Sequence, residues 1–229
     1  MSPRTASPTT RADLIDVAAR LLAEEGQQAM TVRRLASEAG TSTMAIYTQF
    51  GGMDELNRAV RMEGYLRLAR HLGEVPSLRD PVAELSAVGY AYCFNAIENP
   101  NLYRAMFLEG PFEAEELEVC AGTFQRLVSA VEQCIAAGRF RPADSWRLAT
   151  RFWTMAHGVI SVVLAGLVGL DDAIGDLTAM ATHLCAGFGD DPGAAERSVR
   201  RGHRAMEQLR SAAAASGEGR HAARERRAG

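Results

Sequence analysis

Apolar positions recur along most of the chain at intervals of three and four residues, the spacing that places them on one face of an α-helix. The first such segment covers residues 10–25, and its stripe consists of Leu14, Val17, Ala18, Leu21 and Leu22. Thr10 and Asp13 have the spacing of a capping box at the start of this segment, and Gly26 suits its end. No strand-like alternation of useful length occurs, so the pattern predicts an all-α fold.

Glycine, proline and polar residues divide the rest of the pattern into further helices. They are expected as two short helices within 31–50, one helix each at 52–72, 81–97, 101–107, 113–137, 143–168 and 171–187, and a last one at 194–215. The segment after residue 215 is charged and rich in Gly and Ala, which predicts disorder. The prolines at 76 and 81 mark a break, so the predicted parts are residues 8–70, 75–190 and an Arg-rich tail at 191–229.

Charge distinguishes these parts. The net charge of −3 excludes a uniformly basic nucleic-acid binder, and all 25 basic residues are Arg. The first part is mildly basic, the second is acidic and the tail is basic again. This distribution indicates that the first and second parts have different partners.

The stretch TVRRLASEAGTSTMAIYTQFGGMDEL, residues 31–56, predicts two short helices around a sharp turn at Gly40. Thr31 is expected to cap the first helix, and Thr41 or Ser42 the second. In the second helix Ile46 and Phe50 are expected to face inward, which leaves small polar groups and an aromatic ring outward: Thr43, Met44, Tyr47 and Thr48. Such a face suits the major groove of DNA, where hydroxyls and apolar tips contact base edges.

Residues 8–70 resemble the N-terminal helix-turn-helix domain of the TetR family of bacterial transcriptional regulators. The matching pieces are ADLIDVAARLLAEEG, the stretch quoted above and the helix after it. The resemblance implies DNA contacts for Thr31, Arg33, Thr41, Ser42, Thr43, Met44, Tyr47 and Gln49. For Arg33 the alternative of a solvated surface charge stays open, and for Tyr47 that of a half-buried tyrosine.

Three positions depart from the commoner family pattern. Met53 stands where members often have a phosphate-binding Lys, Gln49 replaces a frequent His, and Thr48 replaces an aromatic residue. Fewer ionic contacts are therefore expected, and operator affinity should depend less steeply on salt than is usual for the family.

The second part contains FWTMAHGVISVVLAGL, residues 152–167, in which Trp153 and His157 share a helical face next to Gly158. This resembles the effector domain of the Trp-His-Gly type within the TetR family. The resemblance indicates a largely apolar pocket for a small effector, lined by Phe94, Tyr103, Met106, Phe107, Phe124, Trp153 and His157. The alternative is that Trp153 and His157 are ordinary packed core residues.

The helices at 143–168 and 171–187 are rich in small and apolar residues and are expected to form a homodimer interface. The sequence thus predicts a dimeric regulator, a repressor that binds a pseudo-palindromic operator in double-stranded DNA and is released by the effector. A DNA-binding dimer without an effector is the alternative.

The sequence gives little support for an enzyme, a metalloprotein, a membrane protein or a secreted protein. No catalytic motif or phosphate-binding glycine loop is present, and no metal or cofactor is expected. The acidic run at 113–118 fits a solvated helix start. No segment is long enough to span a membrane and the N-terminus has no secretory signal, so the expected location is the cytoplasm.

Overall fold

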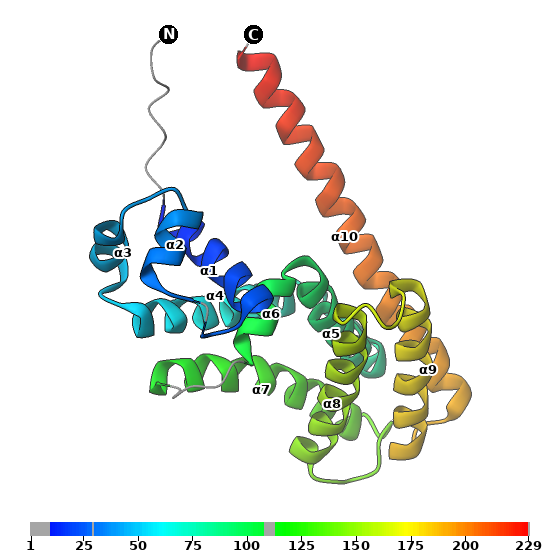
Figure 1. Cartoon of the computed structure of the whole chain (residues 1–229). Helices are drawn as coiled ribbons and strands as arrows, with labels where there is room; N and C mark the ends of the chain where they lie inside the picture. The colour runs from blue at the N-terminus through cyan, green and yellow to red at the C-terminus, as the bar shows by residue number, and fades with distance from the viewer. Residues whose placement is uncertain (1–9, 29, 108–112, 229) are drawn as a thin grey trace. The chain divides into compact units, whose positions relative to one another are not determined.

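The structure is a computed structural model that describes residues 10–28, 30–107 and 113–228, with side chains up to residue 213. Within these ranges all regular structure is helical, which confirms the predicted all-α class (Figure 1). The helices are α1 (Arg11–Glu25), α2 (Val32–Glu38), α3 (Thr43–Phe50), α4 (Met53–Gly73), α5 (Pro81–Glu98), α6 (Pro100–Met106), α7 (Ala114–Ala136), α8 (Ser145–Leu164), α9 (Leu170–Phe188) and α10 (Pro192–Ala228).

The chain divides into two compact units. Unit 1 consists of residues 1–70 and 95–123, and unit 2 of residues 71–94 and 124–229. Unit 1 therefore adds α6 and the first half of α7 to the helices of the predicted N-terminal domain. The contacts that cause this are between helices distant in sequence, since α6 packs against α1. Residues 8, 9, 29, 108–112 and 229 of the predicted parts lie outside the described ranges.

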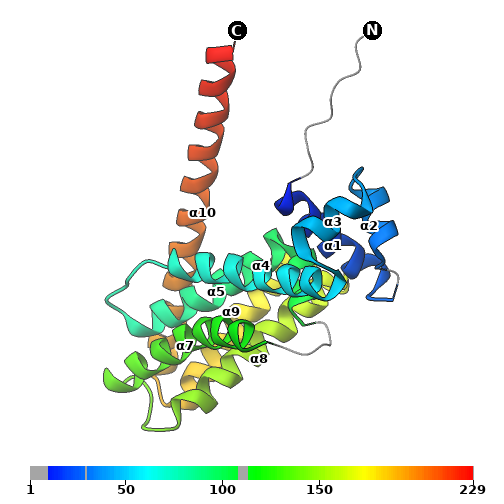
Figure 2. The ribbon, with the colours of Figure 1, turned by 90° about the vertical axis from the view of Figure 1, so that its left-hand side faces the viewer.

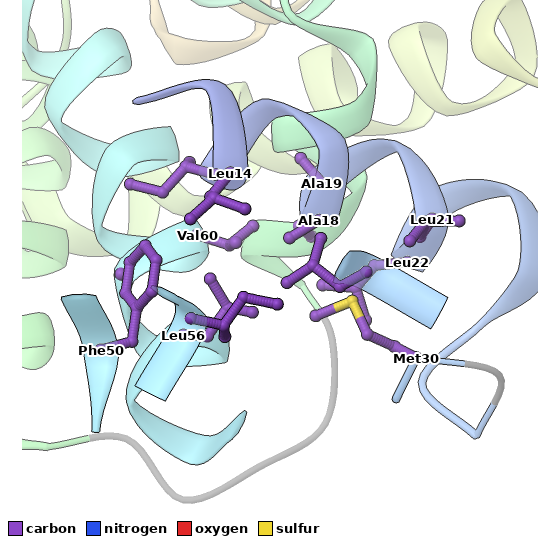
Figure 3. Close-up of a cluster of buried hydrophobic side chains, with 14 of the residues drawn as sticks. Leu14, Ala18, Ala19, Leu21, Leu22, Met30, Phe50, Leu56 and Val60 are labelled. Atoms are coloured by element: carbon purple, nitrogen blue, oxygen red, sulfur yellow. The ribbon is translucent and has the colours of Figure 1, made fainter. Parts of the chain in front are cut away.

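A single apolar core holds unit 1 together (Figure 3). Leu14 of α1, Leu56 and Val60 of α4, Leu35 of α2 and Ile46 of α3 are all fully buried. α6 adds Leu102 and Ala105 to the same core. Burial of a side chain of this size contributes about 1.5–3 kcal/mol, so the two short helices are held by the core and not by their own hydrogen bonds.

The turn between α2 and α3 has the geometry that the sequence predicts. Gly40 has a φ of +62°, and the amide of Thr41 donates to the carbonyl of Ala36 at 2.9 Å, which is the Schellman ending of a helix. Ser42, and not Thr41, then caps α3 by accepting from the amide of Ala45 at 3.1 Å. A residue with a side chain at Gly40 would be strained in this conformation.

A buried ion pair joins α4 to α7 in unit 1. Nε of Arg61 donates to one carboxylate oxygen of Glu116 at 2.8 Å, and a second guanidinium nitrogen donates to the other at 3.1 Å. The Glu116 side chain is fully buried, so the interpretation of the acidic run as a solvated helix start is wrong for this residue. Its neighbours Glu115 and Glu118 are exposed as expected.

In unit 2, α9 packs against both α8 and α10 (Figures 1 and 2). α10 also crosses α5 very closely at Gly202. A Cβ added to Gly202 would lie 2.3 Å from the carbonyl oxygen of Ala83, which is backbone and cannot move aside. The glycine is therefore required for this approach, and it lets Ser86 of α5 donate to the carbonyl of Val199 at 3.1 Å.

Arg139, in the turn after α7, links several helix ends of unit 2. Two of its guanidinium nitrogens donate to the carboxylate of Asp190 at 2.6 Å each, and a third bond of 3.0 Å reaches Asp80. Asp80 also accepts from Ser198 and Arg201 of α10. Although burial alone would raise the pKa of Asp80, these partners hold it below its usual value, so the carboxylate stays charged.

α10 continues as a helix to Ala228, past the end predicted near residue 215. Ala, Arg and Glu dominate the added segment, and their high helix propensity outweighs the low apolar content from which disorder was predicted. Nowhere in residues 10–28, 30–107 and 113–228 is a helix long and apolar enough to cross a membrane.

Candidate DNA-binding surface and ligand-binding residues

The outer face of α3 is formed by the residues that the sequence places there. Thr43 is exposed, Met44 is 71% exposed and Tyr47 is 51% exposed, while Ile46 and Phe50 on the opposite face are buried. Met44 and Tyr47 are large apolar or aromatic side chains, and neighbouring exposed side chains of this kind can form part of a contact surface. α3 is thus supported on one side and free to contact a partner on the other.

The capping hydroxyls of this region retain a proton to donate. Thr31 Oγ1 accepts from the amide of Arg34 at 3.2 Å, and Ser42 Oγ accepts from the amide of Ala45. A hydroxyl that accepts in this way still offers its own hydrogen, and the amides at each helix start favour a negative group. Both helix starts therefore present hydrogen-bond donors to a negative group. Thr41 and Gln49 are half-buried and offer less surface.

The two neighbouring arginines of α2 differ in their surroundings. Arg34 forms ion pairs with Glu25 at 2.8 Å and Glu38 at 2.9 Å. Glu38 also pairs with Arg20, and the hydrogen bond from Arg20 keeps the pKa of Glu38 below its usual value. Within the described part of the chain no ion pair involves Arg33, which is exposed. The charge of Arg33 is therefore available to an external anion, whereas that of Arg34 is balanced internally.

Two further residues, Arg11 and Met53, lie near the C-terminal end of α3. The guanidinium carbon of Arg11 lies 4.7 Å from the centre of the Phe50 ring, so a cation–π contact holds a positive charge beside the end of α3. The sequence analysis did not select Arg11, because only the folded structure brings α1 to this point. Met53, at the start of α4, is partly buried against the apolar core of unit 1. An apolar residue is thus well accommodated at this position.

The residues proposed for an effector pocket are divided between the two units. Tyr103, Met106 and Phe107 belong to unit 1, where Tyr103 and Met106 are buried and Phe107 is 42% exposed. The rings of Tyr103 and Phe107 meet edge to face at 5.2 Å, and the hydroxyl of Tyr65 donates to the carbonyl of Met106 at 3.4 Å. Tyr103 and Met106 therefore contribute to the packing of their own unit.

Four residues of the proposed pocket belong to unit 2: Phe94, Phe124, Trp153 and His157. Trp153 stacks on His157 with ring centres 5.1 Å apart, so the two residues share a face as their spacing predicts. The hydroxyl of Tyr92 lies 3.1 Å from Nδ1 of His157, and burial lowers the pKa of this histidine, so its neutral form is favoured. Tyr92 was not selected from the sequence, because its contact with His157 depends on the packing of α5 against α8.

The aromatic residues of unit 2 differ in how far they are covered. Phe94 is only 2% exposed, and Arg210 of α10 lies over its ring at 4.2 Å. Phe124, Trp153 and His157 are half-buried, and Phe124 contacts the exposed ring of Trp146 at 4.6 Å. No group of His, Cys, Asp and Glu within the described ranges has the arrangement of a metal site.

Two models of protein-family domains match the chain, one in its N-terminal part and one in its C-terminal part. Residues 14–60 match the model described as bacterial regulatory proteins of the tetR family, and residues 85–188 match the tetracyclin repressor-like C-terminal domain. The chain belongs to the TetR family. The match to two successive domains of one family confirms a helix-turn-helix transcriptional regulator. Assignment of the second domain to the Trp-His-Gly type remains a prediction.

Relatives of this chain include other regulators. The uncharacterized HTH-type transcriptional regulator Rv0681 of Mycobacterium tuberculosis is 24% identical over 179 residues, which cover 78% of this chain and 81% of Rv0681. The HTH-type transcriptional regulator BetI of Brucella anthropi is 32% identical over 88 residues, 37% of this chain and 45% of BetI. These names indicate a transcriptional regulator rather than an enzyme.

Solved structures share the fold. The TetR family regulator PfmR from Thermus thermophilus has a TM-score of 0.61 at 22% identity, covering 68% of this chain and 86% of PfmR. AibR, solved in complex with isovaleryl coenzyme A and operator DNA, has a TM-score of 0.58 at 18% identity, covering 66% of this chain and 85% of AibR.

Proposed function

We propose that this TetR-family regulator is a homodimeric repressor that binds a pseudo-palindromic operator and is released by a small, largely apolar effector. The observation that carries the DNA-binding step is the outer face of α3, where Thr43, Met44 and Tyr47 project from a helix braced by a buried core. In the major groove Thr43 and Met44 would contact base edges and thymine methyl groups. Tyr47 would donate to a phosphate.

The charges and hydrogen-bond donors around α2 and α3 support a small number of phosphate contacts. Arg33 is exposed and forms no ion pair with the described residues, the capped helix starts at Thr31 and Ser42 offer donors, and Arg11 adds a charge beside α3. Two copies related by a two-fold axis would bind two half-sites about 34–36 Å apart, which is one turn of DNA.

The matched arginines of α2 provide the test of this function. With the operator duplex recovered from a random-sequence library by selection on the protein, we expect Arg33→Gln to raise the Kd about tenfold and to reduce the salt slope by about 1 per contact. The neighbouring variant Arg34→Gln is the control and should change the Kd less than about twofold, because it removes only exposed ion pairs. Recovery of no preferred duplex, or equal effects of both variants in fluorescence anisotropy, would contradict the proposal.

Replacing Met53 tests whether the missing Lys limits phosphate contact. Met53→Lys is expected to steepen the fall of log K with log salt by about 0.9 per protomer, because each new phosphate contact releases counterions. Met53→Gln is the uncharged control, since it perturbs the same packing against the core without adding a charge. Titrations of the operator duplex between about 50 and 200 mM salt measure the slopes. Identical slopes for the two variants would show that this position does not reach DNA.

The dimer is proposed to form through α8 and α9. On α8 the exposed side carries small residues at helical spacing, Thr154, Gly158 and Ser161, opposite the buried stripe, and the exposed C-cap residue Ala165 continues this row. On α9 Ala179 lies directly opposite the buried Leu177, Ala181 and Cys185. Small side chains allow close helix packing, and Leu167 beside them is 76% exposed. Such a surface is suited to a second copy of the chain.

The effector is proposed to contact Phe124, Trp153 and His157, which combine half-buried aromatic surface with one neutral imidazole. A largely apolar molecule with a single polar group fits these side chains. Three other residues predicted to line the pocket are closely packed: Phe94, Tyr103 and Met106. Their packing favours the alternative function, a DNA-binding dimer without an effector. Compounds that displace the operator duplex in the anisotropy assay support the first interpretation, and binding compounds that never displace it support the second.

A further inference from the structure

We infer that Met44 is a site of reversible oxidation, at which hydrogen peroxide or hypochlorous acid converts the thioether to a sulfoxide and thereby weakens DNA binding. The inference rests on the proposed function, because it requires α3 to be the helix that reads DNA. It adds a chemical signal that acts at the reading helix itself, independently of any effector in unit 2.

Exposure singles out Met44 among the described methionines. Met44 is 71% exposed, whereas Met180 is 44% exposed. The remaining described methionines are more covered: Met30, Met106 and Met206 are buried, and Met53, Met62 and Met155 are half-buried. Oxidation of methionine requires that the oxidant reach the sulfur, so Met44 should react first.

The thiols compete poorly for the oxidant. Cys93, Cys134 and Cys185 are buried, and burial raises the pKa of Cys93 and of Cys185 to about 12 each and raises that of Cys134 as well. Since the thiolate is the reactive form, these cysteines react slowly at neutral pH. Cys120 alone among the described cysteines is partly exposed. It is the one thiol that must be removed to isolate the reaction of Met44.

The reaction is a two-electron oxygen transfer. The sulfur lone pair attacks one oxygen of hydrogen peroxide, the O–O bond breaks, and the products are the sulfoxide and water; with hypochlorous acid the products are the sulfoxide, chloride and a proton. The sulfoxide oxygen is a strong acceptor at a position that would face thymine methyl groups or other base edges. An apolar contact is thus replaced by a polar group that must lose water to enter the groove.

Bound DNA would also control the reaction. In the complex the groove covers Met44, so the free protein should be oxidised faster than the bound protein. Oxidation would then remove regulators from the pool that is searching for an operator, while methionine sulfoxide reductases would restore them.

The experiment uses the full chain carrying Cys120→Ser, treated with a limiting amount of hydrogen peroxide and, separately, hypochlorous acid. Peptide mass spectrometry follows the sulfoxide at each methionine, and anisotropy measures the Kd for the operator duplex. We expect Met44 to be oxidised first, the Kd to rise about tenfold, which is the size of one lost base contact, and the reductases to reverse the change. Prior binding of the duplex should slow oxidation at Met44.

Two variants separate Met44 from other targets, and each is compared with its own unoxidised form. Met44→Leu should show little further change in Kd on oxidation, while Met180→Leu should lose affinity as the parent does. Oxidation of Met44 without a change in Kd, or the same loss in Met44→Leu, would overturn the inference while the proposed function stands. If the unoxidised protein binds no duplex, the proposed function fails first and this inference fails with it.

Discussion

Ala179→Arg should convert the regulator from a dimer to a monomer and weaken operator binding by a factor of about 10² to 10⁴. Ala179 is exposed and lies opposite the buried stripe of α9, at the centre of the proposed interface. Two Arg side chains brought together across a two-fold axis would each be desolvated beside a like charge. The second half-site is then no longer bound by a tethered partner, and its contribution to affinity is lost.

Sedimentation velocity measures the change in mass, and anisotropy measures the Kd for the operator duplex. Gln133→Arg, which adds the same side chain at an exposed position of α7, is the matched control and should remain a dimer. A duplex with only one half-site should be bound equally by Ala179→Arg and the parent chain. A dimeric Ala179→Arg protein would place the interface elsewhere.

Glu116→Gln is expected to lower the free energy of unfolding by about 3–5 kcal/mol, the range found when one partner of a buried ion pair is removed. The substitution keeps the shape of the side chain but removes the carboxylate charge that faces the 7% exposed Arg61. Glu115→Gln, one residue earlier on α7 and exposed, is the control and should change stability by less than about 0.5 kcal/mol. Urea unfolding followed by circular dichroism measures both.

A double variant identifies the cause of this loss. Arg61→Met combined with Glu116→Gln should recover most of the stability, because the buried guanidinium is then removed together with the carboxylate that it pairs with. Burial is the largest single influence and raises the pKa of Glu116, but the hydrogen bonds from Arg61 and the Glu113 amide and the charges of Arg61 and Arg58 together outweigh it, so the pKa is lowered overall. The stabilisation by this carboxylate is therefore present at neutral pH and lost as pH falls through the lowered pKa, so the gap between parent and Glu116→Gln should narrow in acid. A double variant less stable than Glu116→Gln would contradict this account.

Local features of the fold could be predicted because their partners are near in sequence. The capping box of Thr10 with Asp13 is present, with the amide of Thr10 donating to the Asp13 carboxylate at 2.8 Å. The Thr31 cap and the left-handed Gly40 are of the same kind, each defined within three residues. The outer face of α3 follows from helical periodicity alone, so its exposed side chains were predictable before the structure.

Features that depend on distant partners could not be predicted. Glu116 and Arg61 are separated by 55 positions, and nothing in an acidic run shows which carboxylate will be buried. The proposed pocket set illustrates the same limit, since aromatic residues were grouped by type while the fold assigns three of them to unit 1 and four to unit 2. Arg33 and Arg34 are adjacent and alike in sequence, and only the carboxylates of Glu25 and Glu38 distinguish them.

The internal pairing of Arg34 has a consequence for how a regulator finds its target in a chromosome. Affinity for random DNA comes almost entirely from phosphate neutralisation, and it grows with each free cation on the reading surface. Because Glu25 and Glu38 pair with Arg34, and Met53 carries no charge, we expect this surface to bind weakly to DNA that lacks an operator. Under the proposed function, fewer molecules would then be sequestered by the bulk of the genome, and a small number of copies would suffice to keep an operator occupied.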